Sequence, residues 1–234
     1  MTLYLAPLYE DVKPLLIAID CIIFGVQDAK MKLLIFKREV EPLAGSWSLL
    51  GSFVNFEESV DEAAERILFE LTGLEDIYME QLHCFGAVNR DPGGRVVSIA
   101  YWSLIRVDQS HLEFNVRTHE SKWISIDAIP ELVLDHREMV EMAISNLRER
   151  ARFKPIGFEL LPQEFTMVQL LKVYEAIFDH PIDNRNFRKK LLKSGLLIPL
   201  TKKDKSTSKK GSFLYKFNQE TYSKLSREGY SFGF

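Results

Sequence analysis

The sequence predicts an α+β protein built from two parts, and three observations support this. Residues 1–153 alternate segments of strand character with a central amphipathic helix, which is typical of a sheet covered by helices. Residues 154–234 follow the order helix, turn, basic helix and β-hairpin. The first part holds 15 Lys and Arg against 25 Asp and Glu, whereas the second holds 15 against 8. We therefore expect two domains with different partners, joined by a linker at residues 154–157.

Composition excludes several classes of protein. The chain has 234 residues, of which 46% are hydrophobic and 27% charged, as in ordinary globular proteins. Its longest apolar run, residues 15–26, is interrupted by Asp20 and is too short to cross a bilayer, and no basic signal segment precedes it. Cys21 and Cys84 stand alone in apolar runs, which predicts buried reduced thiols and no zinc site. We therefore expect a cytoplasmic protein that needs no cofactor and does not contact a membrane.

The strands of the first part are indicated by apolar and β-branched runs between turn residues. Turn residues fall at 27–30 and 89–94, and residues 136–152 have the apolar spacing of an amphipathic helix. Strands are expected at residues 20–24, 33–37, 79–88, 96–107 and 122–126.

A central helix is expected between Ser59 and Gly73. Ser59 and Glu62 have the spacing of a capping box, and Gly73 supplies the stop. By itself the pattern predicts a surface helix with one buried face. That face repeats at helical spacing and consists of Val60, Ala63, Ala64, Ile67, Leu68 and Leu71.

The second part has the outline of a winged helix-turn-helix. Thr166 and Gln169 form another capping box, which predicts a helix that ends near residues 179–181. Asp183 caps a second helix, which Gly195 ends. A hairpin follows, with strands at residues 196–200 and 213–217 and a lysine-rich loop at residues 201–211.

Basic side chains gather on the second of these helices and in the hairpin loop. A helix fits the major groove, where Arg pairs with guanine and Asn with adenine, and its first turns usually reach the bases. Base contacts are therefore expected from Arg185, Asn186 and Lys189, and phosphate contacts from Arg188, Lys190 and Lys193. The loop lysines expected to hold the DNA backbone or a minor groove are Lys202, Lys203, Lys205, Lys209 and Lys210. Double-stranded DNA is the predicted partner, although a protein-interaction domain could carry the same basic face.

Residues 52–74 resemble a Nudix box, whose pattern is G-x5-E-x7-R-E-U-x-E-E-x-G-U with U an aliphatic residue. Aligned on Gly73, the box places Ser52 at the first Gly and keeps Glu58 and Arg66. The three carboxylates that would hold Mg²⁺ fall on Ile67, Glu70 and Leu71, so that one of the three is kept. The register that starts at Gly51 keeps Glu57 and Glu70 but fits less well, because Glu65 replaces the Arg and Thr72 the last Gly.

The altered box has a chemical consequence. Diphosphate hydrolysis uses hard cations to neutralise the phosphates and activate a water, and Mg²⁺ prefers carboxylate oxygens. Ile67 and Leu71 cannot ligate it, so the resemblance implies a domain that binds without hydrolysing and has neither catalytic residues nor a metal. The alternative is a hydrolase acting on a nucleoside diphosphate derivative or RNA through other ligands, such as Glu57, Glu58 and Glu70.

The whole chain is similar to the Nudix-related transcriptional regulators of bacteria. Besides the degenerate box, the matching pieces are residues 19–24, 37–38, 45–49, 89–93, 134–136, 155–158, 165–166, 186–190 and 214–217. The resemblance implies a Nudix-like α/β/α sandwich in residues 1–153 and a winged helix-turn-helix in residues 154–234. It also implies a homodimer on palindromic operator DNA.

Members of this family respond to ADP-ribose and NAD-related metabolites or to a pentose such as arabinose, and this chain looks closer to the sugar-responsive branch. A pentose effector that controls sugar-utilisation genes is therefore our first expectation, and an ADP-ribose-like effector the second. Sugars are held by charged or amide groups and by stacked aromatic rings. The candidates where a Nudix sheet faces its ligand are Asp20, Arg38, Trp47, Arg90, Asp91, Arg95 and His136.

Overall fold

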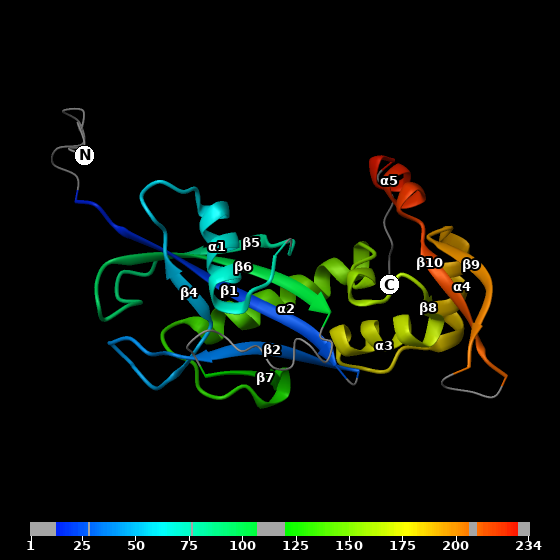
Figure 1. Cartoon of the computed structure of the whole chain (residues 1–234), viewed down its shortest axis with the longest axis horizontal. Helices are drawn as coiled ribbons and strands as arrows, with labels where there is room; N and C mark the ends of the chain where they lie inside the picture. The colour runs from blue at the N-terminus through cyan, green and yellow to red at the C-terminus, as the bar shows by residue number, and fades with distance from the viewer. Residues whose placement is uncertain (1–12, 28, 76, 107–119, 206–209, 229–234) are drawn as a thin grey trace.

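A mixed β-sheet forms the first part of the molecule (Figure 1). The computed structural model describes residues 13–27, 29–75, 77–106, 120–205 and 210–228. β1 pairs with β2 on one side and runs parallel to β6 on the other, and β5 lies at the far edge beyond β6. The strands are β1 (Leu16–Gln27), β2 (Lys30–Lys37), β3 (Trp47–Ser48), β4 (Leu50–Phe53), β5 (Glu80–Phe85), β6 (Val96–Arg106) and β7 (Ser121–Ser125), which a 3-10 turn, η3 (Ile126–Ala128), follows.

Two helices cover opposite faces of this sheet, because β1 is apolar on both faces. Cys21 and Ile23 belong to the buried cluster that contains α1 (Val60–Thr72). The alternating residues Ile22 and Phe24 belong to the cluster that contains α2 (His136–Phe153). Alternate residues of a strand point to opposite faces, so a strand of this kind must be covered twice. The expected α/β/α sandwich is confirmed.

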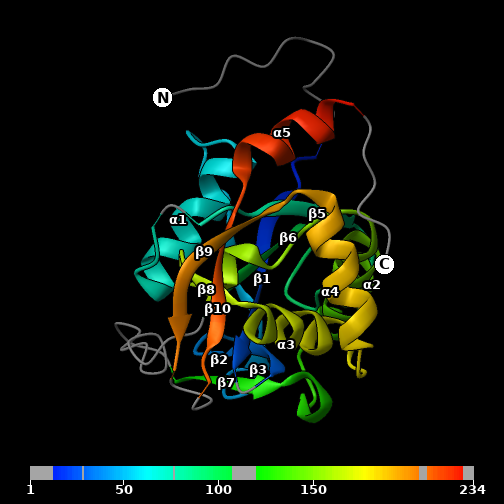
Figure 2. The same ribbon diagram turned by 90° about the vertical axis from the view of Figure 1, so that its right-hand side faces the viewer.

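The second part is the expected winged helix-turn-helix (Figure 2). Its short sheet has the order β8-β10-β9, and both pairs are antiparallel. Phe187 of the second helix packs edge-on against Tyr174 of the first, with ring centroids 5.4 Å apart. The elements are η4 (Phe158–Leu160), β8 (Phe165–Thr166), α3 (Met167–Phe178), α4 (Asn184–Ser194), β9 (Leu197–Asp204), β10 (Ser212–Phe217) and α5 (Gln219–Arg227).

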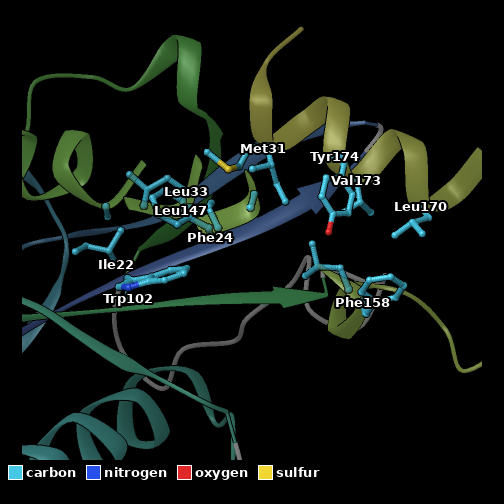
Figure 3. Packing of buried hydrophobic residues seen from close by; sticks show 14 of the residues in the cluster. Ile22, Phe24, Met31, Leu33, Trp102, Leu147, Phe158, Leu170, Val173 and Tyr174 are labelled. Carbon is cyan, nitrogen blue, oxygen red and sulfur yellow. The ribbon is translucent and has the colours of Figure 1, made fainter. Parts of the chain in front are cut away.

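One apolar core continues from the sheet into the second part (Figure 3). Phe24 and Met31, near the turn between β1 and β2, belong to the same buried cluster as Val173 and Tyr174 of α3. Burial of apolar surface is the main favourable contribution to folding, so the two parts stabilise each other. A domain boundary between residues 153 and 154 stays our proposal.

The helix ends follow the local sequence signals. Ser59 Oγ accepts a hydrogen bond from the Glu62 N–H while the Glu62 carboxylate accepts one from the Ser59 N–H, and Gly73 ends α1 at a φ of 72°. Thr166 forms the same capping box with Gln169 at the start of α3, and the Asp183 side chain caps α4 by accepting from the Asn186 N–H. These predictions are confirmed because capping depends on neighbouring residues alone.

Several features differ from the sequence-based expectation. β9 extends to Asp204, into the stretch expected as loop, because its pairing with β10 continues beyond the apolar residues. The two-residue strand β8 and the helix α5 were not expected. Cys21 is buried as expected, but Cys84 is exposed because β5 is an edge strand. None of the described helices is long and apolar enough to cross a membrane.

Candidate functional site

A cavity of about 380 Å³ lies where β1, β2, β4, α1 and the start of α2 meet. Its volume falls within the usual range for small-molecule sites, and several charged side chains converge on it. A hollow beside β5 is larger, at about 660 Å³, but it is more open to solvent. We therefore take the smaller cavity as the candidate effector site and call it the effector cavity.

Asp20 lies at the centre of a buried polar network in the effector cavity. Its Oδ2 accepts a hydrogen bond from Ser98 Oγ at 2.5 Å and lies 3.7 Å from Arg90 Nη2. Its Oδ1 lies 3.4 Å from His136 Nε2, while His136 Nδ1 accepts a hydrogen bond from the Leu49 N–H at 3.0 Å. Because Nδ1 is an acceptor, the proton of the neutral imidazole stands on Nε2 and faces Asp20.

Arg90 joins the effector cavity to the start of α2. Its Nε and Nη2 donate to the two carboxylate oxygens of Asp135 at 2.8 and 2.6 Å. Burial lowers the pKa of Arg90, but the hydrogen bonds and charge of Asp135 outweigh burial, so the pKa is raised overall. The guanidinium is therefore charged and held in one orientation, as expected for a bidentate pair.

Gly51 leaves room for the Asp20 carboxylate. The two residues lie opposite each other in the β1–β4 pair. A methyl group at Gly51 would lie 2.3 Å from Asp20 Oδ1 and 2.9 Å from the carbonyl oxygen of Ile19. Since both distances are shorter than van der Waals contact, any larger residue would displace the carboxylate or the strand.

Five of the seven candidate effector residues line this cavity: Asp20, Arg38, Arg90, Asp91 and His136. Arg38 Nε also donates to the carbonyl oxygens of Val40 and Pro42, at 3.0 and 2.8 Å. Asp91 Oδ1 accepts a hydrogen bond from the Gly93 N–H, which stabilises the turn before β6. Both side chains therefore shape the backbone at the edge of the cavity.

Trp47 and Arg95, the other two candidates, lie outside the cavity lining. Ser48 lines the cavity, and because side chains alternate along a strand, the neighbouring Trp47 faces the other side. Its ring instead lies beneath Lys122 Nζ, 3.9 Å from the ring centroid. Arg95 Nη1 donates to the carbonyl oxygen of Ala87 at 3.2 Å, across the turn.

The lining residues that were not predicted from the sequence include two aromatic rings and one cation: Phe36, Phe53 and Lys37. Phe53 is 50% exposed and supplies the aromatic surface that Trp47 was expected to supply. Alternation along β4 from Gly51 places Phe53 on the same face, but this signal needs the strand boundary to be known.

The polar residues that survive in the degenerate box bind one another. Arg66 Nη2 and Nε donate to the two oxygens of Glu58 at 2.6 and 2.8 Å, and its Nη1 donates to Glu70 at 3.1 Å. The Arg66 hydrogen bonds, helped by the Asn55 N–H, lower the pKa of Glu58 from 4.5 to about 2. One arginine therefore binds both of these carboxylates.

The Nudix fold implies a magnesium site, and the residues present do not fit one. Ile67 has no exposed surface and packs in the core, and Leu71 offers only carbon atoms to the cavity. Glu58 and Glu70 are held by Arg66. Within the described ranges, no three His, Cys, Asp or Glu side chains form a group that could hold a metal ion.

The second candidate site is the exposed face of α4. Phe187 and Leu191 face inward and are 1% and 0% exposed, as the helical spacing predicts. The Asn186 N–H donates to the capping oxygen of Asp183 at 2.7 Å. The residues proposed for DNA contact on this helix are all exposed: Arg185, Asn186, Arg188, Lys189, Lys190 and Lys193.

The hairpin lysines divide into two groups. Lys202 and Lys203 stand on β9 and make internal contacts, the first with Glu164 at 3.2 Å and the second over the Phe213 ring at 4.4 Å. Lys205 and Lys210 are exposed near the end of the hairpin. Lys209 lies outside the described residues. Lys202 and Lys203 are exposed as well, so all four described lysines remain able to face DNA.

Family models match both parts of the chain. The NUDIX domain model matches residues 14–143, and the model for the NrtR DNA-binding winged helix domain matches residues 157–217. The chain therefore belongs to the Nudix family, and its combination of parts is that of the Nudix-related transcriptional regulators.

Particular regulators share this combination. The ADPR responsive transcriptional repressor NtrR of Acinetobacter baylyi is 29% identical over 211 residues, which cover 88% of this chain and 84% of the relative. The crystal structure of Shewanella oneidensis NrtR complexed with a 27mer DNA has a TM-score of 0.77 at 27% identity, covering 92% of this chain and 96% of that one. The NUDIX domain of the same protein complexed with ADP ribose has a TM-score of 0.52 at 27% identity, covering 62% and 94%.

The Nudix part is also similar to an enzyme. An ADP-ribose pyrophosphatase of Methanocaldococcus jannaschii is 30% identical over 117 residues, which cover 50% of this chain and 68% of the relative. These relatives are named for ADP-ribose and not for a pentose. The expectation of an arabinose-like effector and of sugar-utilisation genes is therefore not supported, and the second expectation agrees with the relatives.

Proposed function

We propose that this protein is a DNA-binding repressor whose operator affinity is controlled by ADP-ribose bound in the effector cavity. One observation carries the proposal: a cavity with buried polar side chains and no magnesium-ligand set in its lining is joined by a continuous core to an exposed basic helix. The repressor of Acinetobacter baylyi and the two NrtR complexes support the choice of effector and of partner.

The effector cavity offers groups that complement each part of ADP-ribose. Lys37 and Arg38 lie at its edge and supply positive charge for the diphosphate. Asp20 and Asp91 can accept hydrogen bonds from ribose hydroxyls. The half-exposed ring of Phe53 offers a surface on which the adenine can stack.

We further propose that ADP-ribose is bound without being cleaved. Hydrolysis in this fold would need cation ligands where Ile67 and Leu71 stand, and Arg66 occupies the carboxylates of Glu58 and Glu70. Loss of the metal leaves the diphosphate charge to the cationic side chains, which can bind it but cannot activate a water as a metal does.

The binding half of this proposal is tested by isothermal titration calorimetry with ADP-ribose and, for comparison, arabinose. ADP-ribose should bind and arabinose should not, and Arg38→Ala should weaken binding about tenfold or more, because hydrogen bonds to charged groups contribute about 1.5–3 kcal/mol. Arg95→Ala is the matched control, since Arg95 lies outside the cavity lining, and it should change affinity less than about twofold. Equal losses in the two variants would show that the ligand binds elsewhere.

A hydrolase is the second candidate function, favoured by the similarity to the pyrophosphatase of Methanocaldococcus jannaschii. Incubation of the protein with ADP-ribose and Mg²⁺ would then release AMP and ribose 5-phosphate, and Glu70→Gln would abolish the release. Our proposal expects intact ADP-ribose after the incubation, as judged by ion-exchange chromatography.

We propose that the operator is bound by a homodimer. A two-fold dimer places two recognition helices on half-sites about one helical turn apart. Apolar residues at the start of β1 that a partner could cover are Leu15, Leu16 and Ile17, which are 50%, 52% and 43% exposed. Sedimentation velocity should give about twice the chain mass of 27.1 kDa, and a species of 27.1 kDa at operator-binding concentrations would contradict the dimer.

A further inference from the structure

Helix α2 runs from the effector cavity to the helix-turn-helix. At its start, Asp135 binds Arg90 through both carboxylate oxygens. The next residue, His136, accepts a hydrogen bond from the Leu49 N–H and faces Asp20. Near its other end lies Arg148, about 18 Å from His136 at the rise of an α-helix. One element therefore contacts both the effector cavity and the first helix of the helix-turn-helix.

The middle of α2 is closely packed. The side chains on its inner face have no exposed surface: Met139, Val140, Ala143, Leu147 and Ala151. Packed interfaces of this kind shift as units and do not deform continuously. A displacement of the first turn of α2 is therefore passed on to Arg148.

Arg148 supplies a hydrogen bond that α3 cannot make for itself. The carbonyl of Ile177 is among the last four of α3, which have no donor within the helix, and the residue four positions later, Pro181, has no N–H. Arg148 Nε donates to this carbonyl at 2.9 Å, and its Nη2 lies 3.6 Å from Asp179 Oδ2. A cation is also favoured at the C-terminus of a helix by the helix dipole.

The contact adjoins the turn that leads into the recognition helix. Asp179 ends α3 with a φ of 60°, and Asp183 caps α4. Between them the Ile182 N–H donates to Glu175 Oε1 at 3.1 Å, which ties the turn to α3. A shift of the end of α3 therefore changes the orientation of α4.

We propose that Arg148 is the positioning residue through which ADP-ribose in the effector cavity changes the DNA affinity of α4. This inference rests on the proposed function. ADP-ribose must form hydrogen bonds with a cavity whose buried polar groups, Asp20, Arg90 and His136, also hold the start of α2. Its binding moves α2, and Arg148 transmits the movement to the end of α3.

The test measures the operator affinity of the full chain with and without saturating ADP-ribose. The wild-type ratio of the two affinities should be about fivefold or more, as is typical of coupled sites, and Arg148→Ala should reduce it below about twofold. The ADP-ribose affinity of the free variant should stay near the wild-type value, because Arg148 does not line the effector cavity. By reciprocity, DNA should also cease to change the ADP-ribose affinity of this variant.

Arg152→Ala is the matched control. Arg152 is an exposed arginine near the end of the same helix, and no bond from it to α3 is present in the described structure. Arg152→Ala should keep the wild-type ratio of operator affinities with and without ADP-ribose. Arg148→Lys, which retains a charge and a donor, should recover at least part of the ratio. If circular dichroism shows the alanine variant unfolded, Arg148→Met, which keeps the side-chain length without a charge or donor, replaces it and should show the same loss of the ratio.

The outcomes separate this inference from the proposed function. If the wild-type operator affinity does not respond to ADP-ribose, the proposed function is wrong and the inference falls with it. If the wild type responds and Arg148→Ala responds equally, only the inference is overturned. A merely structural role would weaken DNA binding equally with and without ADP-ribose, and that unchanged ratio also overturns it.

Discussion

At the residue scale, the effector cavity depends on charged groups that hold one another. Asp20 is bound by Ser98 and faced by Arg90 and His136, and Arg90 is bound in turn by Asp135. A buried charge without a partner costs several kcal/mol, so these groups keep their positions only as a set. The cavity is therefore formed before the ligand arrives, and a ligand that bonds to one member disturbs the others.

Gly51→Ala tests this arrangement. The added methyl would lie 2.3 Å from Asp20 Oδ1, so we expect a loss of about 1–3 kcal/mol of stability and much weaker ADP-ribose binding. Gly86→Ala is the control, because its nearest neighbour would be a Val97 methyl at 4.0 Å, and it should change stability by no more than about 0.5 kcal/mol. Urea denaturation and calorimetry measure both effects, and similar losses in the two variants would contradict the role of the close approach.

Glu58→Gln tests the ion pair with Arg66. Arg66 lowers the pKa of folded Glu58 to about 2 from an ordinary value of 4.5, so the pair stabilises the fold above pH 4.5, and this contribution is lost as the pH falls to 2. The stability difference between wild type and Glu58→Gln should therefore narrow across that range. Urea denaturation at a series of pH values measures it, with Glu57→Gln as an exposed control. A difference that stays constant down to pH 2 would show that the pair does not favour folding.

At the scale of elements, the winged helix-turn-helix presents α4 and the hairpin as separate basic surfaces. α4 carries Asn and Arg side chains that can read bases, whereas the hairpin end carries lysines, which act as point charges on phosphates. The two elements should therefore contribute to different properties, α4 to selectivity and the hairpin to general affinity.

Arg185→Ala and Lys205→Ala test this division. Arg185→Ala should reduce the preference for operator over random DNA by about 1–3 kcal/mol, the usual contribution of a bidentate base contact. Lys205→Ala should weaken binding to both DNAs alike and reduce the salt dependence by about one phosphate contact. Fluorescence anisotropy on both duplexes at several salt concentrations measures this. The same change of selectivity in both variants would refute the assignment.

Helices were predictable from the sequence where their signals are local. Ser59, Thr166 and Asp183 cap helices through residues three positions away, and each prediction is confirmed. β8 could not be predicted, because its two residues are a strand only by pairing with β10, far along the chain. Trp47 was assigned to the effector cavity because its chemistry suits a sugar, but the pleat of β3 turns it away. Prediction of the effector cavity therefore required the register of the sheet as well as the residue types.

At the scale of the whole molecule, the continuous core makes the two parts one cooperative unit. Ile177 of α3 has no exposed surface and belongs to the same cluster as Phe24 and Trp102 of the sheet. Movement of one part is therefore resisted by the packing of the other, which is the condition under which a bound ligand can bias a distant helix.

Ile177→Ala tests this unity. Removal of a fully buried Ile side chain should cost about 2–5 kcal/mol and lower the Tm by about 2–4 °C for each kcal/mol. All three tryptophans, Trp47, Trp102 and Trp123, lie in the first part, so their fluorescence reports the Nudix half although the change is in α3. Val168→Ala, on the 46% exposed side of the same helix, is the control and should change the Tm little. A fluorescence transition unaffected by Ile177→Ala would show that the two parts unfold independently.

The central claim is that the effector cavity binds ADP-ribose, leaves it intact and thereby controls DNA. The most direct measurement is the anisotropy of a labelled operator duplex bound to the full chain, followed at fixed salt with Mg²⁺ present while ADP-ribose is added. We predict that the operator is released and that the lowered signal stays constant for hours, because no ADP-ribose is consumed. A signal that does not respond to ADP-ribose, or that recovers with time as the ligand is cleaved, would contradict the account.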